Sequence, residues 1–432
     1  MKNTDHPIAN TTQIHLLDLV ICLSDTMDLI SPDVVNHHKQ VAYIALNIAG
    51  ELKLSAEQTN NIVMAAALHD IGAISLKDRL STLCFEMEAP HRHAELGYYL
   101  LKMFEPFSGI ATLVRFHHTA WNNGNVTKAE REQIPVGSFI LHLADRVAVL
   151  INRKKEITGQ IQPICSKIEA LANKTFMPEQ IDALKRLAKN EYFWHDIVSS
   201  TIGTILSLRA QTKAIEMDIH EFLSLANMLR RIIDFRCRFT ATHSSGVAAC
   251  AEGLARLANF TDRMCLTVRI AGYLHDLGKI AIPSELLEKS SKLLNEEFSI
   301  IQNHVLYTHN VLSAVKGLEV INSWASFHHE RLDGKGYPFQ LRDVDLPAGS
   351  RILAVADVFT AITEDRPYRK GMSRGEALQV IQKMVIDSAL DTEIVSLLIH
   401  HYDTIDALRL SAQSASIEEY RQFLKLQSAY LN

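Results

Sequence analysis

The sequence predicts an all-α protein built from two tandem copies of one helical domain. Apolar residues recur at helical spacing in most segments, for example in VAYIALNIAGEL (41–52), IDALKRLA (181–188) and ALQVIQKMVI (377–386). Alternating β patterns are scarce, and prolines and glycines gather between the helical runs. The length of 432 residues exceeds one typical hydrophobic core, which indicates two or three domains.

The two copies are revealed by a repeated pattern of histidines and aspartates. In the first copy the pattern comprises His37, His69, Asp70, His93, His117, His118 and Asp145. In the second copy it comprises His243, His275, Asp276, His304, His328, His329 and Asp357. In both copies 32 residues separate the first histidine from the His-Asp pair, and 24 separate the next histidine from the His-His pair. Chance would rarely reproduce both spacings and their order, so we predict a tandem duplication.

The repeat places the first domain at about residues 12–200 and the second at 215–432. The segment 203–240 between the two patterns is compatible with a helix, and we expect it to join the domains.

Composition and charge indicate the cellular compartment and the kinds of partner to expect. The net charge of −5 gives no reason to expect duplex DNA as a partner. Six scattered cysteines without a CxxC pair suit reduced thiols in a cytosol. The N-terminus lacks the features of a signal peptide, and no apolar run is long enough to cross a bilayer. We therefore expect a cytoplasmic protein without a membrane anchor, and the sequence leaves a homodimer open.

The second pattern has the composition of a metal centre. A lone histidine on an apolar helix face is usually a core residue, but five imidazoles and two carboxylates in a repeated order suit divalent Fe, Mn, Co or Zn. Seven ligands exceed the needs of one ion, whereas two ions bridged by a carboxylate would use them. Asp276 directly follows a histidine of the pattern, so it is the natural bridge. Two such ions can hold a hydroxide and clamp a phosphoryl group, which predicts phosphoester hydrolysis.

Three segments of the second copy carry a family resemblance. HDLGKIAIP (275–283), HHERLDGKGYP (328–338) and VADVFTAITEDRPYRK (355–370) resemble the HD-GYP subfamily of the HD superfamily. The resemblance spans the whole second copy and implies a tandem arrangement of an HD-type domain and an HD-GYP domain. It implies hydrolysis of a cyclic dinucleotide, cyclic di-GMP or 3′,3′-cyclic GMP-AMP, to a linear dinucleotide by attack of a metal-bridging hydroxide.

The resemblance also implies roles for individual residues. The seven residues of the second pattern would hold two divalent ions, with iron or manganese favoured. Asp276 and Lys279 would be catalytic. The implied substrate-binding residues are Gly336, Tyr337, Arg366 and Arg369.

Two positions depart from the family pattern. Phe239 stands where some members have a glutamate that supports a third metal, so we expect two metals. Thr360 replaces an aspartate that neighbours the substrate in many members, which leaves the base preference open. Two alternatives to the phosphodiesterase therefore remain: a cyclic dinucleotide sensor or scaffold without turnover, and an HD-type nucleotidase.

The first copy keeps the metal-binding pattern but lacks the phosphate-facing groups. Ala73 occupies the lysine position, HHTAWNNGN replaces the GYP loop, and INRKK replaces RPYR. Asp33 lies four residues before His37, at the position that Phe239 occupies in the second copy. The copy is a candidate for a second metal site, and we predict a regulatory or structural role. A second active site with another specificity is the remaining alternative.

Overall fold

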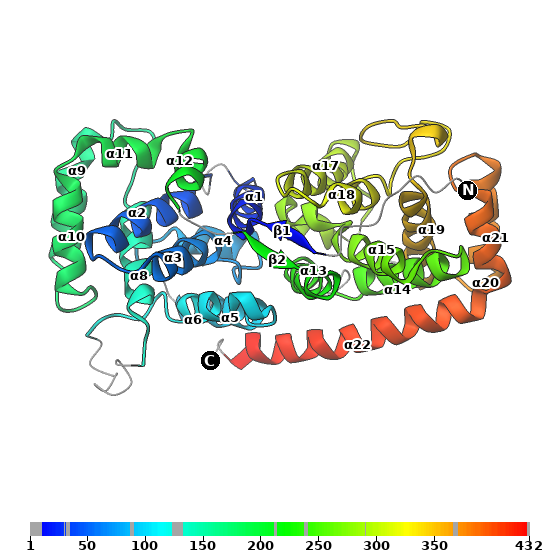
Figure 1. Ribbon diagram of the computed structural model, residues 1–432, viewed down its shortest axis with the longest axis horizontal. Coiled ribbons are helices and arrows are strands. Elements are labelled where there is room, and N and C mark those ends of the chain that lie inside the picture. Colours follow the sequence, from blue (N-terminus) through cyan, green and yellow to red (C-terminus); the bar gives the residue numbers. More distant parts are fainter. Residues whose placement is uncertain are drawn as a thin grey trace. The chain divides into compact units, whose positions relative to one another are not determined.

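The computed structural model describes residues 11–29, 31, 35–86, 90–122, 133–210, 214–236, 241–289, 291–365 and 370–429. The chain folds into two compact units, and Figure 1 gives their elements. One unit comprises residues 15–213 with 425–432, and we call it the first domain. The other comprises residues 1–14 with 214–424, and we call it the second domain.

Helices build the first domain throughout the residues described. Its elements are α1 (Leu16–Asp28), α2 (His37–Glu51), α3 (Ala56–Leu68), α4 (Leu76–Thr82), α5 (Pro90–Leu101), η1 (Glu105–Phe107), α6 (Ser108–Arg115), α8 (Val136–Val149), η2 (Thr158–Gln160), α9 (Ile161–Glu169), α10 (Pro178–Ala188), α11 (Glu191–Val198) and α12 (Ile202–Arg209). Helix α2 lies at the centre and packs against α3 and α8.

The second domain is also helical, apart from two short strands. Strands β1 (Thr12–Ile14) and β2 (Ile215–Met217) pair antiparallel, with Gln13 opposite Glu216. The other elements are α13 (Ile219–Asp234), α14 (His243–Leu257), α15 (Asp262–Leu274), η3 (Leu277–Ala281), α16 (Ser284–Leu287), α17 (Asn295–Ser313), α18 (Glu319–Ser326), η4 (Asp343–Asp345), α19 (Ala348–Thr363), α20 (Arg374–Ile386), α21 (Thr392–His400) and α22 (Tyr402–Ala429). The all-α prediction is confirmed.

The predicted joining segment does not act as one helix. Its N-terminal part forms α12 in the first domain, and its C-terminal part forms β2 and α13 in the second. The strand β1, at the start of the chain, belongs to the second domain because it pairs with β2.

The sequence repeat has a matching structural repeat. Helices α2 and α14 are both 15 residues long, and each begins at the first histidine of its pattern. Helices α3 and α15 are both 13 residues long, and each ends immediately before a His-Asp pair. Their N-termini are capped at equivalent positions, where the Ser55 and Thr261 hydroxyls accept backbone N–H groups. Equivalent sequence signals therefore begin and end equivalent helices.

A glycine follows each His-Asp pair because two backbone segments approach closely there. A Cβ atom at Gly72 would lie 2.1 Å from the carbonyl oxygen of His93, and one at Gly278 would lie 1.9 Å from that of His304. A side chain at either position would push the His-Asp turn away from the next helix of the pattern. The glycine therefore keeps the turn and that helix in contact.

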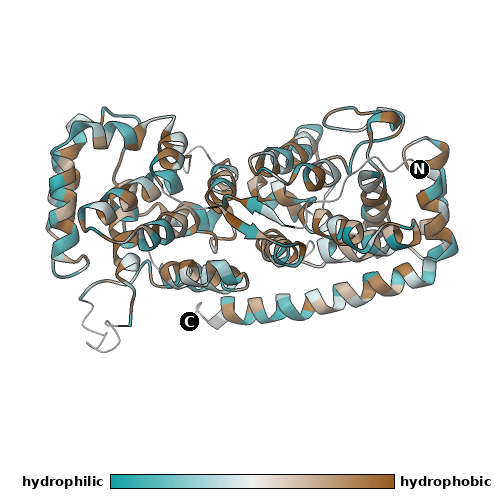
Figure 2. Cartoon of the chain, in the orientation of Figure 1, coloured by the Kyte–Doolittle hydropathy of each residue, from teal (hydrophilic) through white to brown (hydrophobic). Residues whose placement is uncertain are grey.

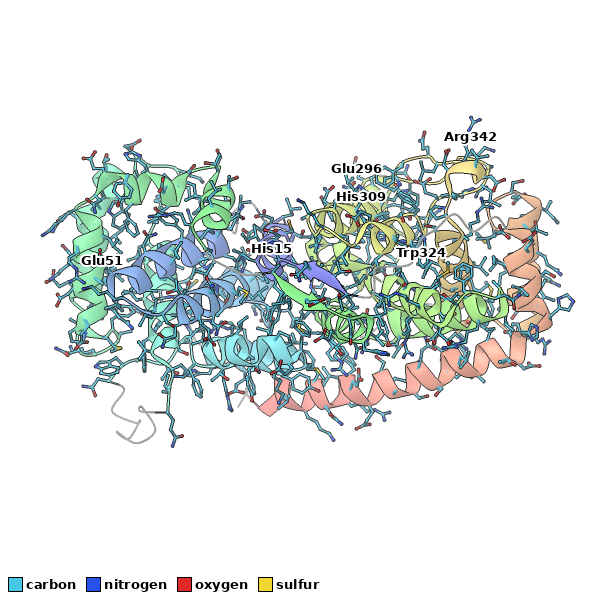
Figure 3. All side chains as sticks on the ribbon, viewed as in Figure 1. His15, Glu51, Glu296, His309, Trp324 and Arg342 are labelled. Atoms are coloured by element: carbon cyan, nitrogen blue, oxygen red, sulfur yellow. The ribbon has the colours of Figure 1, made fainter. Side chains whose placement is uncertain are left out.

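Amphipathic helices form the core of each domain. In Figure 2 the helices carry both apolar and polar residues along their length, as helices with one buried face do. Trp324 is fully buried in the second domain, and a Cβ atom at Gly349 would lie 2.1 Å from its indole ring (Figure 3). Helices α18 and α19 therefore pack closely there. Among the described residues, no helix combines the length and the apolar character needed to span a bilayer.

Candidate metal centre

The seven residues of the second pattern come from five segments of the second domain. His243 begins α14, His275 and Asp276 follow α15, and His304 lies within α17. The pair His328-His329 follows α18, and Asp357 lies in α19. Six of the seven residues are buried, and His329 is partly exposed. Tertiary packing thus brings together residues up to 114 positions apart.

The histidines form two groups that could each hold a metal ion. One group is His243, His275 and Asp276, and the other is His304, His328 and His329. Asp276 lies between the groups: its Oδ2 atom is 3.2 Å from Nε2 of His275, and its Oδ1 atom is 3.3 Å from Nε2 of His304. One carboxylate oxygen faces each group, which is the geometry of a bridging ligand.

Backbone hydrogen bonds orient three of these imidazoles. The Nδ1 atoms of His275, His304 and His328 lie 2.8, 2.6 and 2.6 Å from the carbonyl oxygen three residues earlier. A carbonyl only accepts, so each Nδ1 carries the proton and each Nε2 presents a lone pair. These three buried Nε2 atoms have no hydrogen-bond partner. Buried polar atoms without a partner are rare, and divalent cations bound at the two groups would satisfy all three.

The electrostatics of the centre match ligands ready to bind a cation. Burial lowers the pKa of His304 to about 3 and holds the pKa of His328 well below its usual value, so both are neutral at pH 7. Burial alone would raise the pKa of Asp276, but His275 and Lys279 outweigh it and hold that pKa well below the usual range. The centre therefore combines two neutral imidazoles with an ionised carboxylate. At His243 and His275 the neighbouring carboxylates outweigh burial and raise the pKa, so a bound cation would displace a proton there.

Lys279 lies beside the proposed bridge. Its Nζ atom donates to Oδ2 of Asp276 at 2.6 Å, and its side chain is 17% exposed. The Lys279 ammonium group is held by Asp276 and is reachable from solvent, so it can approach an anionic oxygen of a bound molecule.

The HHERLDGKGYP segment forms a loop held by one buried carboxylate. Glu330 accepts the backbone N–H groups of Phe339, Gln340 and Leu341 at 2.7, 3.2 and 3.0 Å. A Cβ atom at Gly336 would lie 2.4 Å from the Cα atom of Glu330, so the glycine permits this close return of the chain. Arg342 follows the segment by four residues and lies beside it, since a Cβ atom at Gly334 would be 2.9 Å from its Cγ atom (Figure 3). Glu330 directly follows the His-His pair, and this position is the one signal in the sequence that could have indicated its role.

Only some of the predicted substrate-binding residues lie in the part of the chain that the structure describes. The Tyr337 ring lies 4.9 Å from the His329 ring at an interplanar angle of 35°, so the GYP loop reaches the metal centre. Arg366 and Arg369 lie outside the described residues, as do Phe239 and Asp33.

Thr360 is fully buried, and its hydroxyl faces Sγ of Cys250 at 3.8 Å. It packs α19 against α14, and the base preference stays open.

A second carboxylate that the sequence analysis missed supports His243. Glu364 Oε1 lies 3.1 Å from Nδ1 of His243, on the side of the ring opposite Asp357. The other oxygen of Glu364 accepts from Gln413 of α22 at 3.1 Å, and the Gln413 carbonyl accepts from Arg409 at 2.7 Å. Glu364 follows Asp357 by seven residues, two helical turns, and this spacing could have indicated it.

The first domain contains a similar but closed cluster. All seven residues of its pattern are buried, and they form the groups His37, His69, Asp70 and Asp70, His93, His117, His118. Arg146 of α8 pairs with Asp145, its Nη2 atom lying 2.6 Å from Oδ2. The equivalent position in the second domain is Val358, which carries no charge. By contrast, the His329 side chain of the second domain is 28% exposed.

Comparison with known families and proteins gives a consistent picture. An HD domain family model matches residues 34–150, and a second HD domain model matches residues 227–394. The chain is 28% identical over 401 residues to a 3′3′-cGAMP-specific phosphodiesterase of Vibrio cholerae, covering 90% of this chain and 92% of that protein. It is 37% identical over 142 residues to a cyclic di-GMP phosphodiesterase of Pseudomonas aeruginosa, covering 33% and 34%.

A solved structure shares the fold. The crystal structure of a cyclic GMP-AMP specific phosphodiesterase of V. cholerae matches with a TM-score of 0.62 at 21% identity, covering 91% of this chain and 98% of that one.

Proposed function

Since the chain belongs to the HD-domain family and carries two HD domains in tandem, we propose that it is a metal-dependent phosphodiesterase that opens a cyclic dinucleotide to a linear one. The observation that carries the proposal is the position of Asp276 between two groups of buried imidazoles. This arrangement suits two divalent ions that share one carboxylate.

We propose two ions, with iron or manganese favoured by the mixture of imidazole and carboxylate ligands. His243, His275, Asp276 and Asp357 would hold one ion, and Asp276 with His304, His328 and His329 would hold the other. When bound, such ions lower the pKa of water and offset the negative charge of a phosphoryl group.

The remaining groups would bind and orient the substrate. Lys279 would place its ammonium group against a phosphate oxygen, because it is anchored on Asp276 and partly exposed. Tyr337 would offer its ring face to a base beside His329. Arg366 and Arg369 remain proposed phosphate contacts on the strength of the sequence resemblance, because a guanidinium group suits bidentate binding of phosphate.

Of the two candidate substrates, we favour 3′,3′-cyclic GMP-AMP. The relative with that specificity in its name is similar over nearly the whole length of both chains. The relative named for cyclic di-GMP matches about a third of this chain. In this proposal the second domain is catalytic, and the first domain, whose cluster is buried, has another role.

The test is product formation by the full chain under anaerobic conditions, with Fe(II) or Mn(II) and each cyclic dinucleotide in turn. We expect a linear dinucleotide, with faster turnover of 3′,3′-cyclic GMP-AMP, and loss of turnover in the His275→Ala/Asp276→Ala variant. Lys279→Met should bind metal normally and lose at least about tenfold in kcat, since one positioned charge is typically worth that much or more. Tight binding of the dinucleotides without product would instead support the sensor. Turnover of mononucleotides alone would support the nucleotidase.

A further inference from the structure

Lys279 lies on a short turn whose two ends are held by different helical segments. This turn, η3, has five residues and directly follows Asp276. We propose that Arg236 is a positioning residue for Lys279: its buried guanidinium group fixes the backbone that carries the lysine and thereby places the ammonium group for the substrate. The proposal rests on the proposed function, because it names a further residue that serves the same site.

Arg236 donates to two carbonyl oxygens at the end of the turn. Its Nη1 atom lies 2.7 Å from the carbonyl oxygen of Lys279, and its Nη2 atom lies 3.1 Å from that of Ile282. Arg236 follows α13 and is 5% exposed. Carbonyl oxygens at the end of a helical turn carry partial negative charge, which suits a cation. The planar fork of a guanidinium group fixes the orientation of both peptide groups, which one ammonium group cannot do.

The start of the turn is held separately, by Thr308 of α17. The Thr308 hydroxyl donates to the carbonyl oxygen of His275 at 3.1 Å and accepts the backbone N–H of Gly278 at 2.9 Å. Thr308 is fully buried. Because Thr308 fixes the start of the turn, the position of its end, and of Lys279, depends on Arg236.

The side chain of Lys279 is long, so the place of its ammonium group depends on the place of its backbone. The Nζ atom lies 2.6 Å from Oδ2 of Asp276. A shift of the turn would move the Lys279 Cα atom and break this contact. Misplacing a group at an active site by about 1 Å can lower the rate by about 100-fold, so the backbone anchor bears on turnover as well as on folding.

The first domain holds the equivalent turn in a different way. Ala73 occupies the lysine position, and its carbonyl oxygen accepts from Nε of Arg79 at 3.0 Å. Arg79 lies in α4, after the turn, and its Nη1 atom donates to the carbonyl oxygen of Met27 at 2.9 Å. Gly97 stands at the position of Thr308. The double anchor of the second domain therefore accompanies the lysine, and Arg79 offers a matched control.

The first experiment is a double-mutant cycle on turnover of 3′,3′-cyclic GMP-AMP by the full chain loaded with Mn(II). Arg236→Lys keeps the charge but cannot span both carbonyl groups, so we expect kcat to fall about tenfold and KM to change by less than about twofold. In a Lys279→Met background the same change should lower kcat by less than about twofold, because the residue to be positioned is absent. Arg79→Lys should leave kcat within about twofold of the unmodified chain.

The second measurement does not need turnover. The metal-free full chain is acetylated, and peptide mass spectrometry gives the rate at Lys279 relative to that at Lys289. The reference lysine also donates to a carboxylate at 2.6 Å, that of Glu297, and its side chain is 28% exposed. Arg236→Lys should raise the relative rate at Lys279 several-fold, because the ammonium group is no longer held on Asp276. Arg79→Lys should leave the ratio unchanged.

Two results would each overturn the proposal: an equal loss of kcat in both backgrounds, as a role in stability alone would give, and an unchanged acetylation ratio in Arg236→Lys. If that variant does not fold, Arg236→Gln takes its place, because glutamine keeps a donor for one carbonyl group. Failure of both variants to fold would show a role in folding and overturn the proposal as well. If the full chain opens no cyclic dinucleotide, the proposed function fails, and the acetylation ratio still decides the role of Arg236.

Discussion

Replacing Glu364 by glutamine should weaken metal binding at the second domain through a conflict of hydrogen-bond donors. Arg409 has no acceptor, so the Gln413 carbonyl must face it and the Gln413 amide must face Glu364. A carboxylate at position 364 accepts from both Gln413 and Nδ1 of His243. The Nδ1 proton of His243 is thereby held by Glu364, and Nε2, which lies 3.0 Å from Oδ1 of Asp357, is the atom that would bind a metal ion beside Asp357.

The magnitude follows from the number of donors left without a partner. A Glu364→Gln side chain has one oxygen and one amide group, so one of its two neighbours meets a donor. An unpaired buried donor costs about 1–3 kcal/mol. If His243 avoids that cost by moving its proton to Nε2, it loses its metal-binding lone pair. Since about 1.4 kcal/mol corresponds to tenfold in affinity, we expect metal affinity to fall about 10- to 100-fold, as found for outer partners of metal-bound histidines.

The assay is titration of the metal-free full chain with Mn(II), followed by the electron paramagnetic resonance signal of the free ion. Glu418→Gln is the matched control, because Glu418 lies on α22 with its side chain 57% exposed and pairs with Arg421 rather than with a ligand. Circular dichroism and the melting temperature check that both variants fold. An affinity in Glu364→Gln within twofold of the unmodified chain, or an equal loss in Glu418→Gln, would refute the reasoning.

Three further predictions concern the loop, the His-Asp turn and a buried acid of the second domain. Glu330→Gln should release part of the GYP loop, because the amide end of glutamine cannot accept the backbone N–H groups; we expect a higher KM with little change in metal content, whereas an unchanged KM would contradict this. Gly278→Ala should destabilise the second domain by more than about 3 kcal/mol in urea unfolding, since its Cβ atom would lie 1.9 Å from a carbonyl oxygen and the turn would have to shift; Gly375→Ala, which meets no atom within 4 Å, is the control. Burial raises the pKa of Asp234 from 3.8 to about 6. The folded chain thus holds this proton more tightly than the unfolded chain, and Asp234 contributes stability below pH 4 that is lost as the pH rises through 6. Asp234→Asn should remove this pH-dependent contribution to the free energy of unfolding, which is up to about 3 kcal/mol. Equal pH profiles of unfolding for both proteins would contradict the assignment.

The sequence by itself determined the fold class, the duplication and which residues converge on each centre. These features follow from local regularities: apolar residues at helical spacing, capping residues such as Ser55 and Thr261, and a glycine after each His-Asp pair. The pattern repeats because each histidine must occupy the same place on an equivalent helix. The spacing of the pattern therefore indicates which residues take equivalent places in the two domains.

Only the tertiary structure decided how the two centres differ. Arg146 follows Asp145 in the sequence, yet its closing role depends on carbonyl oxygens more than 60 residues away. Glu364 acquires its role from Gln413, 49 residues later on another helix. The Thr360 hydroxyl faces Cys250 in the α14–α19 interface, a contact that its sequence position did not indicate. The physical reason is common to all three: burial and long-range hydrogen bonds depend on which surfaces meet, and helical periodicity predicts that a face is buried but not what it meets.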